Sequence, residues 1–190
     1  MNINRGMKRL AASLADAVTD RDLGDPTSAD ALCRALCEEM AQRRGRPIVL
    51  RFERFPDEAG VTGLMLSFDT YDMILVEQRH DPVQQVVVVG HELWHLTQGH
   101  GRPAEGDPAV PAGALAGDAG ARPGPAGRWA DVLRSFAARS HCHDDHERDA
   151  ESFGLLLGSR LRTLIEDPHH RRAAHRDGIS NRIQASLGVR

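Results

Sequence analysis

The chain of 190 residues is 41% hydrophobic and 27% charged, so it can bury a core as one domain, and wholesale disorder is excluded. Its formal net charge of -3 argues against a globally basic nucleic-acid-binding protein, and its three cysteines are too few for a disulfide scaffold. Because no apolar run reaches membrane-spanning length and no signal segment follows the N-terminus, we expect a cytoplasmic protein.

Apolar residues recur at helical spacing in the first part of the chain. Residues 7–18 form one such pattern and predict a helix. A second helical pattern follows a polar stretch and ends at Gly45. It contains Cys33 and Cys37 at a spacing of four, which predicts two small core residues rather than a disulfide.

Three strands are expected next. Residues 47–55 alternate apolar and polar side chains, which is typical of a strand. Residues 64–68 and 73–77 have the same character. Residues 69–72 are suited to a turn, so the last two strands are expected to form a hairpin.

Asp81 and Pro82 predict the start of a third helix, because Asp is a good N-cap and Pro loses no needed hydrogen bond at the first helical position. The valines at 86–89 alone would also suit a buried strand. The H-E-x-x-H motif at residues 91–95, described below, favours a helix, because its two histidines can bind one metal ion only when they lie one helical turn apart. Gly99 or Gly101 would end it.

The second half of the chain alternates between turn-rich and helical patterns. Residues 103–127 are rich in Pro, Gly and Ala and predict a flexible insertion. Residues 128–138 regain helical periodicity, and residues 144–165 predict a strong helix. The tail, residues 166–190, contains one short helical pattern.

The strongest chemical signal is the H-E-x-x-H motif at residues 91–95. His91 and His95 are four apart, so on a helix both imidazoles share one face and can bind one metal ion. Glu92 lies one step around the helix, where it can accept a proton from a metal-bound water without being a ligand. The motif therefore predicts a catalytic zinc site.

A third protein ligand must come from another part of the chain. The metzincin class would need Gly three residues and His six residues after His95, but Gln98 and Gly101 stand there. Glu147 shares a helix face with apolar residues, and a carboxylate on such a face is costly unless it is paired or binds a metal.

Several neighbours of Glu147 compete for the same role. Glu151 lies one helical turn further on, and three further candidates directly precede Glu147: His143, Asp144 and His146. Helix spacing leaves this choice open, because an acidic first turn is also favoured by the helix dipole without any metal.

The combination of H-E-x-x-H at residues 91–95 with E-x-x-A-x-x-F at residues 147–153 resembles the ImmA/IrrE family of small metallopeptidases. The resemblance covers about residues 31–165. Trp94 stands where the family commonly has Gly, and Gly154 replaces the usual Ala.

The resemblance implies an α+β fold, with a minimal zincin-like core of several helices and a small three-stranded sheet. Together with the helical N-terminal region, we expect one zincin-like metallopeptidase domain over residues 1–165 with a flexible insertion at 103–127, followed by a C-terminal tail at 166–190 with a short helix.

The resemblance also implies the site and its activity. His91, His95 and Glu147 would be the Zn²⁺ ligands and Glu92 the general base of a zinc-dependent endopeptidase. The expected substrate is a partner protein, such as a helix-turn-helix transcriptional repressor, in a bacterial regulatory or stress-response module. The alternative is a non-catalytic, zinc-stabilised partner-binding protein, or the toxin component of a toxin–antitoxin pair. Neither nucleic acid nor a membrane is an expected partner.

Two further features of a peptidase stay open in the sequence. The group that stabilises the oxyanion is not identified, and the candidates are Tyr71, His100, His141 and His143. The predicted hairpin could hold an extended peptide by adding it to the edge of the sheet, or it could be an ordinary sheet edge.

Overall fold

The computed structural model describes residues 5–19, 21, 29–99, 102–103 and 144–166, and within them the fold is α+β, as predicted. The α-helices of this part are α1 (Arg5–Thr19), α2 (Ala29–Arg44), α3 (Pro82–Gln98) and α5 (Asp144–Glu166). The strands are β1 (Ile48–Glu53), β2 (Gly63–Ser67), β3 (Asp72–Glu77) and β4 (Arg102–Pro103), and a short 3-10 helix, η1, covers Asp57–Ala59.

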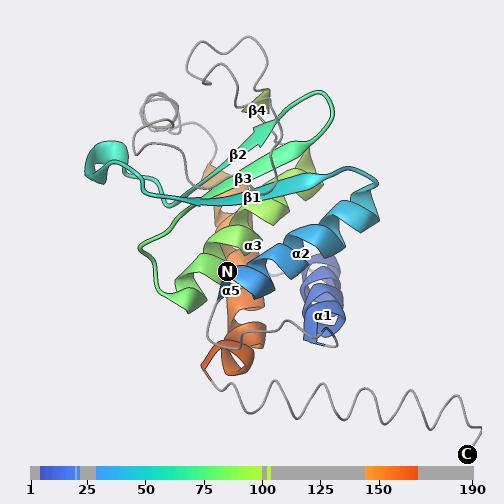
Figure 1. Ribbon diagram of the computed structural model, residues 1–190. Helices are drawn as coiled ribbons and strands as arrows, with labels where there is room; N and C mark the ends of the chain where they lie inside the picture. Colours follow the sequence, from blue (N-terminus) through green and yellow to red (C-terminus); the bar gives the residue numbers. More distant parts are fainter. Residues whose placement is uncertain (1–4, 20, 22–28, 100–101, 104–143, 167–190) are drawn as a thin grey trace, which may run out of the picture.

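The strands form one mixed sheet in the order β1-β3-β2-β4, and the helices gather beneath it (Figure 1). β2 and β3 pair antiparallel, which confirms the predicted hairpin. β1 pairs parallel with β3, from Ile48 opposite Asp72 to Glu53 opposite Glu77. β4 adds only two residues alongside the end of β2. The three expected strands are therefore present, with a short fourth strand beside them.

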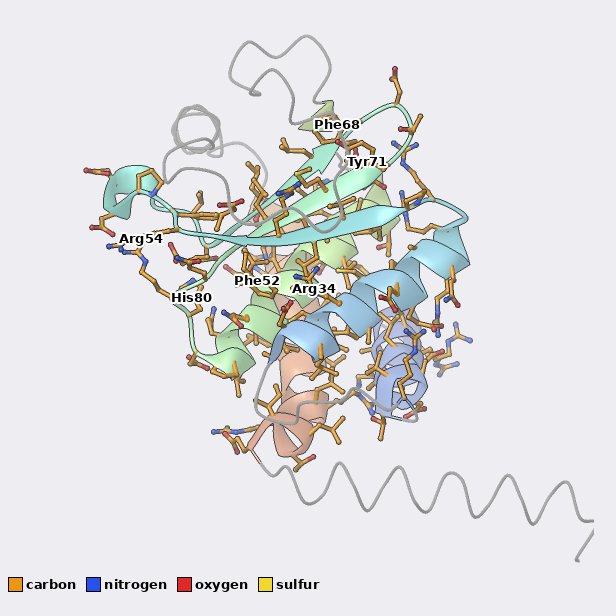
Figure 2. The ribbon with its side chains drawn as sticks, in the orientation of Figure 1. Arg34, Phe52, Arg54, Phe68, Tyr71 and His80 are labelled. Carbon is orange, nitrogen blue, oxygen red and sulfur yellow. The ribbon has the colours of Figure 1, made fainter. Side chains whose placement is uncertain are left out.

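Both faces of this sheet are apolar, which explains why its strands are hydrophobic almost throughout. The face away from the helices carries a cluster of buried residues: Phe55, Leu64, Leu66, Phe68, Met73 and Leu75. Tyr71 packs at the rim of this cluster and stacks on Phe68, with ring centroids 4.6 Å apart (Figure 2).

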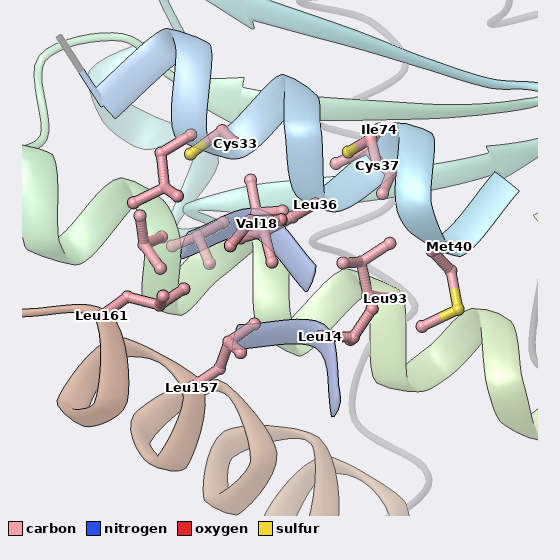
Figure 3. Close-up of a cluster of buried hydrophobic side chains, with 14 of the residues drawn as sticks. Leu14, Val18, Cys33, Leu36, Cys37, Met40, Ile74, Leu93, Leu157 and Leu161 are labelled. Carbon is pink, nitrogen blue, oxygen red and sulfur yellow. The ribbon is translucent and has the colours of Figure 1, made fainter. Parts of the chain in front are cut away.

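The main core lies between the sheet and the helices. It joins residues of α1, α2, α3 and α5 to Leu50, Ile74 and other inward-facing strand residues. Cys33 and Cys37 of α2 are buried in it as free thiols, which confirms the prediction made for them (Figure 3). Burial raises the pKa of the Cys37 thiol to about 12, so both side chains act as small apolar residues.

Glu77, at the end of β3, anchors the segment that connects β1 to β2. Its carboxylate accepts hydrogen bonds from the backbone N–H groups of Phe55 (2.9 Å) and Arg79 (2.8 Å). The Arg79 guanidinium binds the same carboxylate and also reaches Asp57 at 2.5 Å. Burial alone would raise the pKa of Glu77, but these hydrogen bonds lower it to about 2.

The structure changes the predicted start of the insertion and leaves several predicted segments undescribed. Pro103, expected to begin the insertion, pairs with Ser67 as part of β4. Residues 104–127, the helical pattern at 128–138 and the tail from residue 167 lie outside the described residues. None of the described helices is long and apolar enough to cross a membrane.

Candidate metal centre

α3 carries the H-E-x-x-H motif, and both of its ends are capped as the sequence predicts. The Asp81 carboxylate accepts hydrogen bonds from the N–H groups of Val83 and Gln84, both at 3.0 Å. At the other end Gly99 has a φ of 71° and its N–H bonds back to the last turn. The helix is thus continuous through the motif, and this places His91 and His95 one turn apart on the same face.

Arg44, the last residue of α2, fixes the C-terminal end of α3. Its Nη1 donates a hydrogen bond of 2.5 Å to the carbonyl oxygen of Leu96, the residue directly after His95. Its Nη2 lies 3.5 Å from Oδ2 of Asp72, at the start of β3. The C-terminal end of α3 is therefore held by contacts that join it to both α2 and the sheet.

α5 packs closely against α3, and glycine makes this possible. A Cβ atom at Gly154 would lie 2.4 Å from the carbonyl oxygen of Val87 and 3.2 Å from the backbone nitrogen of His91. A Cβ atom at Gly90 would lie 3.0 Å from the Cα atom of Gly154. The two backbones cross at this point, two helical turns along α5 from Glu147.

Trp94 packs against α5 as well. Its indole is buried and lies against the Phe153 ring, with centroids 5.1 Å apart and planes inclined by 31°. The large side chain inside the motif therefore fills the contact between the two helices.

The side chains of His91, His95 and Glu147 converge at the end of this helix pair. The two Nε2 atoms lie 3.0 Å apart. Glu147 Oε2 lies 3.3 Å from His91 Nε2, and Oε1 lies 3.4 Å from His95 Nε2. Zinc bonds of about 2.0–2.1 Å in a tetrahedron separate neighbouring ligand atoms by about 3.3 Å, so these spacings fit one metal ion. No other such group of three His, Cys, Asp or Glu side chains occurs in the described part of the chain.

Glu147 lies at the rim of the core rather than inside it. Its side chain is 51% exposed, although the sequence pattern placed it on the apolar face of its helix. The carboxylate turns toward the imidazoles, while its exposed side leaves the group accessible from solvent. A catalytic zinc site requires such an open position.

The electrostatics of the group couple its members. Burial lowers the pKa of His91, but the hydrogen bond to Glu147 and the charges of Glu92, Glu147 and Glu151 outweigh it and raise this pKa. Hydrogen bonds from His91 and His95 hold the pKa of Glu147 well below its usual range. The site therefore favours positive charge between the imidazoles and the carboxylate, and a divalent cation would supply that charge without a proton.

Glu92 follows His91 in α3, and its side chain is buried, with only 7% exposed. Burial raises its pKa, while the neighbouring charges of His91 and His95 lower it. A Cβ atom at Gly63, the first residue of β2, would lie 2.6 Å from Glu92 Oε1. The carboxylate thus lies against the start of β2 and interacts electrostatically with both histidines.

The other candidates of the sequence are not part of this group. Glu151 and His146 are exposed on α5 and are not among its three ligand-bearing residues. Tyr71 packs on Phe68 at the hairpin turn. Three histidines, His100, His141 and His143, and the side chain of Asp144 lie outside the described residues.

The close approaches at Gly63 and Gly154 were missed by the sequence reasoning, which noted Gly154 only as a departure from a family pattern. The side chain of Glu147, in contrast, lies where the resemblance predicts it. Comparison with models of protein families, with curated proteins and with solved structures gives no match for this chain.

Proposed function

We propose that this protein is a zinc-dependent endopeptidase of the ImmA/IrrE type. One observation carries the proposal: His91, His95 and Glu147 converge from two helices at zinc-like spacing, and the buried carboxylate of Glu92 interacts electrostatically with all three. A purely structural zinc site has no use for this fourth group. His91, His95 and Glu147 would hold the ion, and Glu92 would be the general base.

A zinc ion held there would polarise a peptide carbonyl and lower the pKa of a bound water toward about 7. Glu92 would accept the proton of the attacking water and then deliver it to the leaving amine. Its burial suits this role, because a raised carboxyl pKa brings a base closer to the pH at which it works.

The edge of the sheet offers a way to hold the substrate. β2 has β4 beside it only at Leu66 and Ser67, and no described strand pairs with the outer side of its first residues. Gly63, one of these first residues, lies against the side chain of Glu92. An extended peptide added there as a strand would pass close to the general base. The resemblance favours a repressor or antitoxin as the protein that supplies this peptide.

The decisive experiment compares the wild-type protein with Glu92→Gln. Both should bind one zinc ion with similar affinity, but only the wild type should cleave a candidate repressor or a peptide library, and a chelator should abolish that cleavage. Equal cleavage by Glu92→Gln would refute the assigned role of Glu92.

The alternative is a binding protein in which zinc only stabilises the fold. The observation in its favour is that His91 and His95 lie on α3 and Glu147 on α5, so an ion bound by all three would strengthen the packing of these helices. In that case zinc would raise the melting temperature, and neither the wild-type protein nor Glu92→Gln would cleave any peptide.

A further inference from the structure

Gly63 is a glycine that its own backbone does not require. Its φ is not positive, and it pairs with Val76 as a regular residue of β2. Glycine in a strand weakens it, and it often marks a place where another group approaches closely. The reason for this glycine must therefore lie in its neighbours.

Those neighbours are two side chains of α3. A Cβ atom at Gly63 would lie 2.5 Å from Val88 Cγ1, 2.6 Å from Glu92 Oε1 and 3.3 Å from Glu92 Cδ. Val88 and Glu92 are four residues apart and so share the helix face that packs under β2. Both contacts are far shorter than a carbon atom normally accepts.

The two side chains differ in how easily they can move. A valine in a helix has one strongly preferred rotamer, and Val88 is buried in the core. The carboxylate of Glu92 is the end of a longer, more flexible side chain. A methyl group at position 63 would therefore displace the Glu92 carboxylate before it displaced Val88.

We propose that Gly63 is a positioning residue, whose missing side chain provides the space that holds the Glu92 carboxylate beside His91 and His95. This inference rests on the proposed function, because Glu92 is taken as the base of that reaction. Gly63 touches neither metal nor water in this role and acts only through Glu92.

Gly63→Ala tests the proposal. A misplacement of about 1 Å can cost about 100-fold in rate, so we expect kcat to fall by about 10- to 100-fold while KM and zinc affinity change by less than about 3-fold. In a Glu92→Asp background, where the carboxylate is retracted by one methylene, the same substitution should change kcat by less than about 3-fold.

Val88→Ala provides the matched control, because it removes the second contact. If the effect acts through Glu92, Gly63→Ala should lower kcat as strongly in the Val88→Ala background as in the wild type. Recovery of kcat in the double variant would overturn the proposal, since the clash with Val88 would then be the cause. The double variant also tests the proposal if Gly63→Ala alone does not fold.

A second measurement does not depend on activity. In metal-free protein, the carboxyl carbon resonance of Glu92 can be assigned in ¹³C NMR spectra by its loss in Glu92→Gln. We expect this resonance to shift in Gly63→Ala while that of Glu147 stays in place. If no peptide is cleaved by the wild type, the proposed function fails but the spectrum still tests the positioning. An unmoved Glu92 resonance, or an unchanged kcat in an active protein, would overturn the inference.

Discussion

Gly154 of α5 lies so close to Val87 of α3 that a Cβ atom at Gly154 would be 2.4 Å from the Val87 carbonyl oxygen. A backbone oxygen inside a helix cannot turn aside, so only the distance between the helices could change. This contact therefore sets the separation at which Glu147 meets the two imidazoles.

Gly154→Ala should for this reason weaken metal binding. We expect zinc affinity, measured by competition with a chromophoric chelator, to fall at least about 10-fold, and stability to fall by about 1–3 kcal/mol from overpacking. Gly158→Ala is the matched control, because its Cβ would meet the side chain of Val87 (Cγ2 at 2.5 Å) rather than its backbone. Zinc binding as tight in Gly154→Ala as in the wild type would contradict the role of this contact.

Glu147→Gln should remove the third ligand while keeping the shape of the side chain. Replacement of outer-shell partners of a metal site typically costs about 10- to 100-fold in affinity, so loss of a direct ligand should cost about 100-fold or more. Glu151→Gln, one turn along the same exposed face, should change the affinity only a few-fold. Calorimetric titration with zinc would distinguish the two, and similar losses in both variants would show that Glu147 is not a ligand.

The parts of the fold that local chemistry determines could be predicted from the sequence. Asp81, Pro82 and Gly99 set the ends of α3, and the spacing of His91 and His95 follows from the helix alone. The hairpin of β2 and β3 was predicted for the same reason, since its turn residues lie between two apolar runs.

Contacts between distant elements could not be predicted in this way. The parallel pairing of β1 with β3 depends on the sheet as a whole, and no residue of β1 encodes it locally. The need for glycine at positions 63 and 154 comes from atoms of α3, and in both cases these atoms belong to residues far from the glycine in the sequence. The choice of Glu147 over Glu151 likewise depended on where this helix crossing places the first turn of α5.

Metal affinity should depend on pH through His91. Zinc binds neutral imidazole, so protons compete with the metal. In metal-free protein Glu147 helps to raise the pKa of His91 above 6.5, so this competition begins at a higher pH than for an isolated histidine. We expect zinc affinity to fall steadily as the pH drops from about 8 to 6.

The metal-free protein should respond in the opposite direction. A raised His91 pKa contributes stability that is fully present below pH 6.5 and is lost as the pH rises through the folded-state value. The melting temperatures measured with chelator and with zinc should therefore move further apart as the pH rises. A constant difference between the two melting temperatures across this range would contradict the assignment of His91 as a metal ligand.

Acid should act on the fold mainly through carboxylates with lowered pKa values, and Glu77 provides a clear case. Its pKa is about 2 in the folded protein, compared with 4.5 for an ordinary glutamate. A group with a lowered pKa contributes stability that is present above pH 4.5 and is lost as the pH falls toward 2. Glu77→Gln removes this contribution, so the variant should be less stable by about 1–3 kcal/mol at neutral pH.

The difference between the wild type and Glu77→Gln should then shrink as the pH falls from 4.5 toward 2. Urea unfolding with chelator present would measure it without a contribution from zinc. Asp57→Asn is the matched control, because this exposed acid contacts the same Arg79 but accepts no backbone hydrogen bond from Phe55. A difference that stayed constant over this pH range would show that the Glu77 carboxylate does not anchor the connection between β1 and β2. That connection leads directly into Gly63, so its loosening should also lower the rate of any reaction that depends on Glu92.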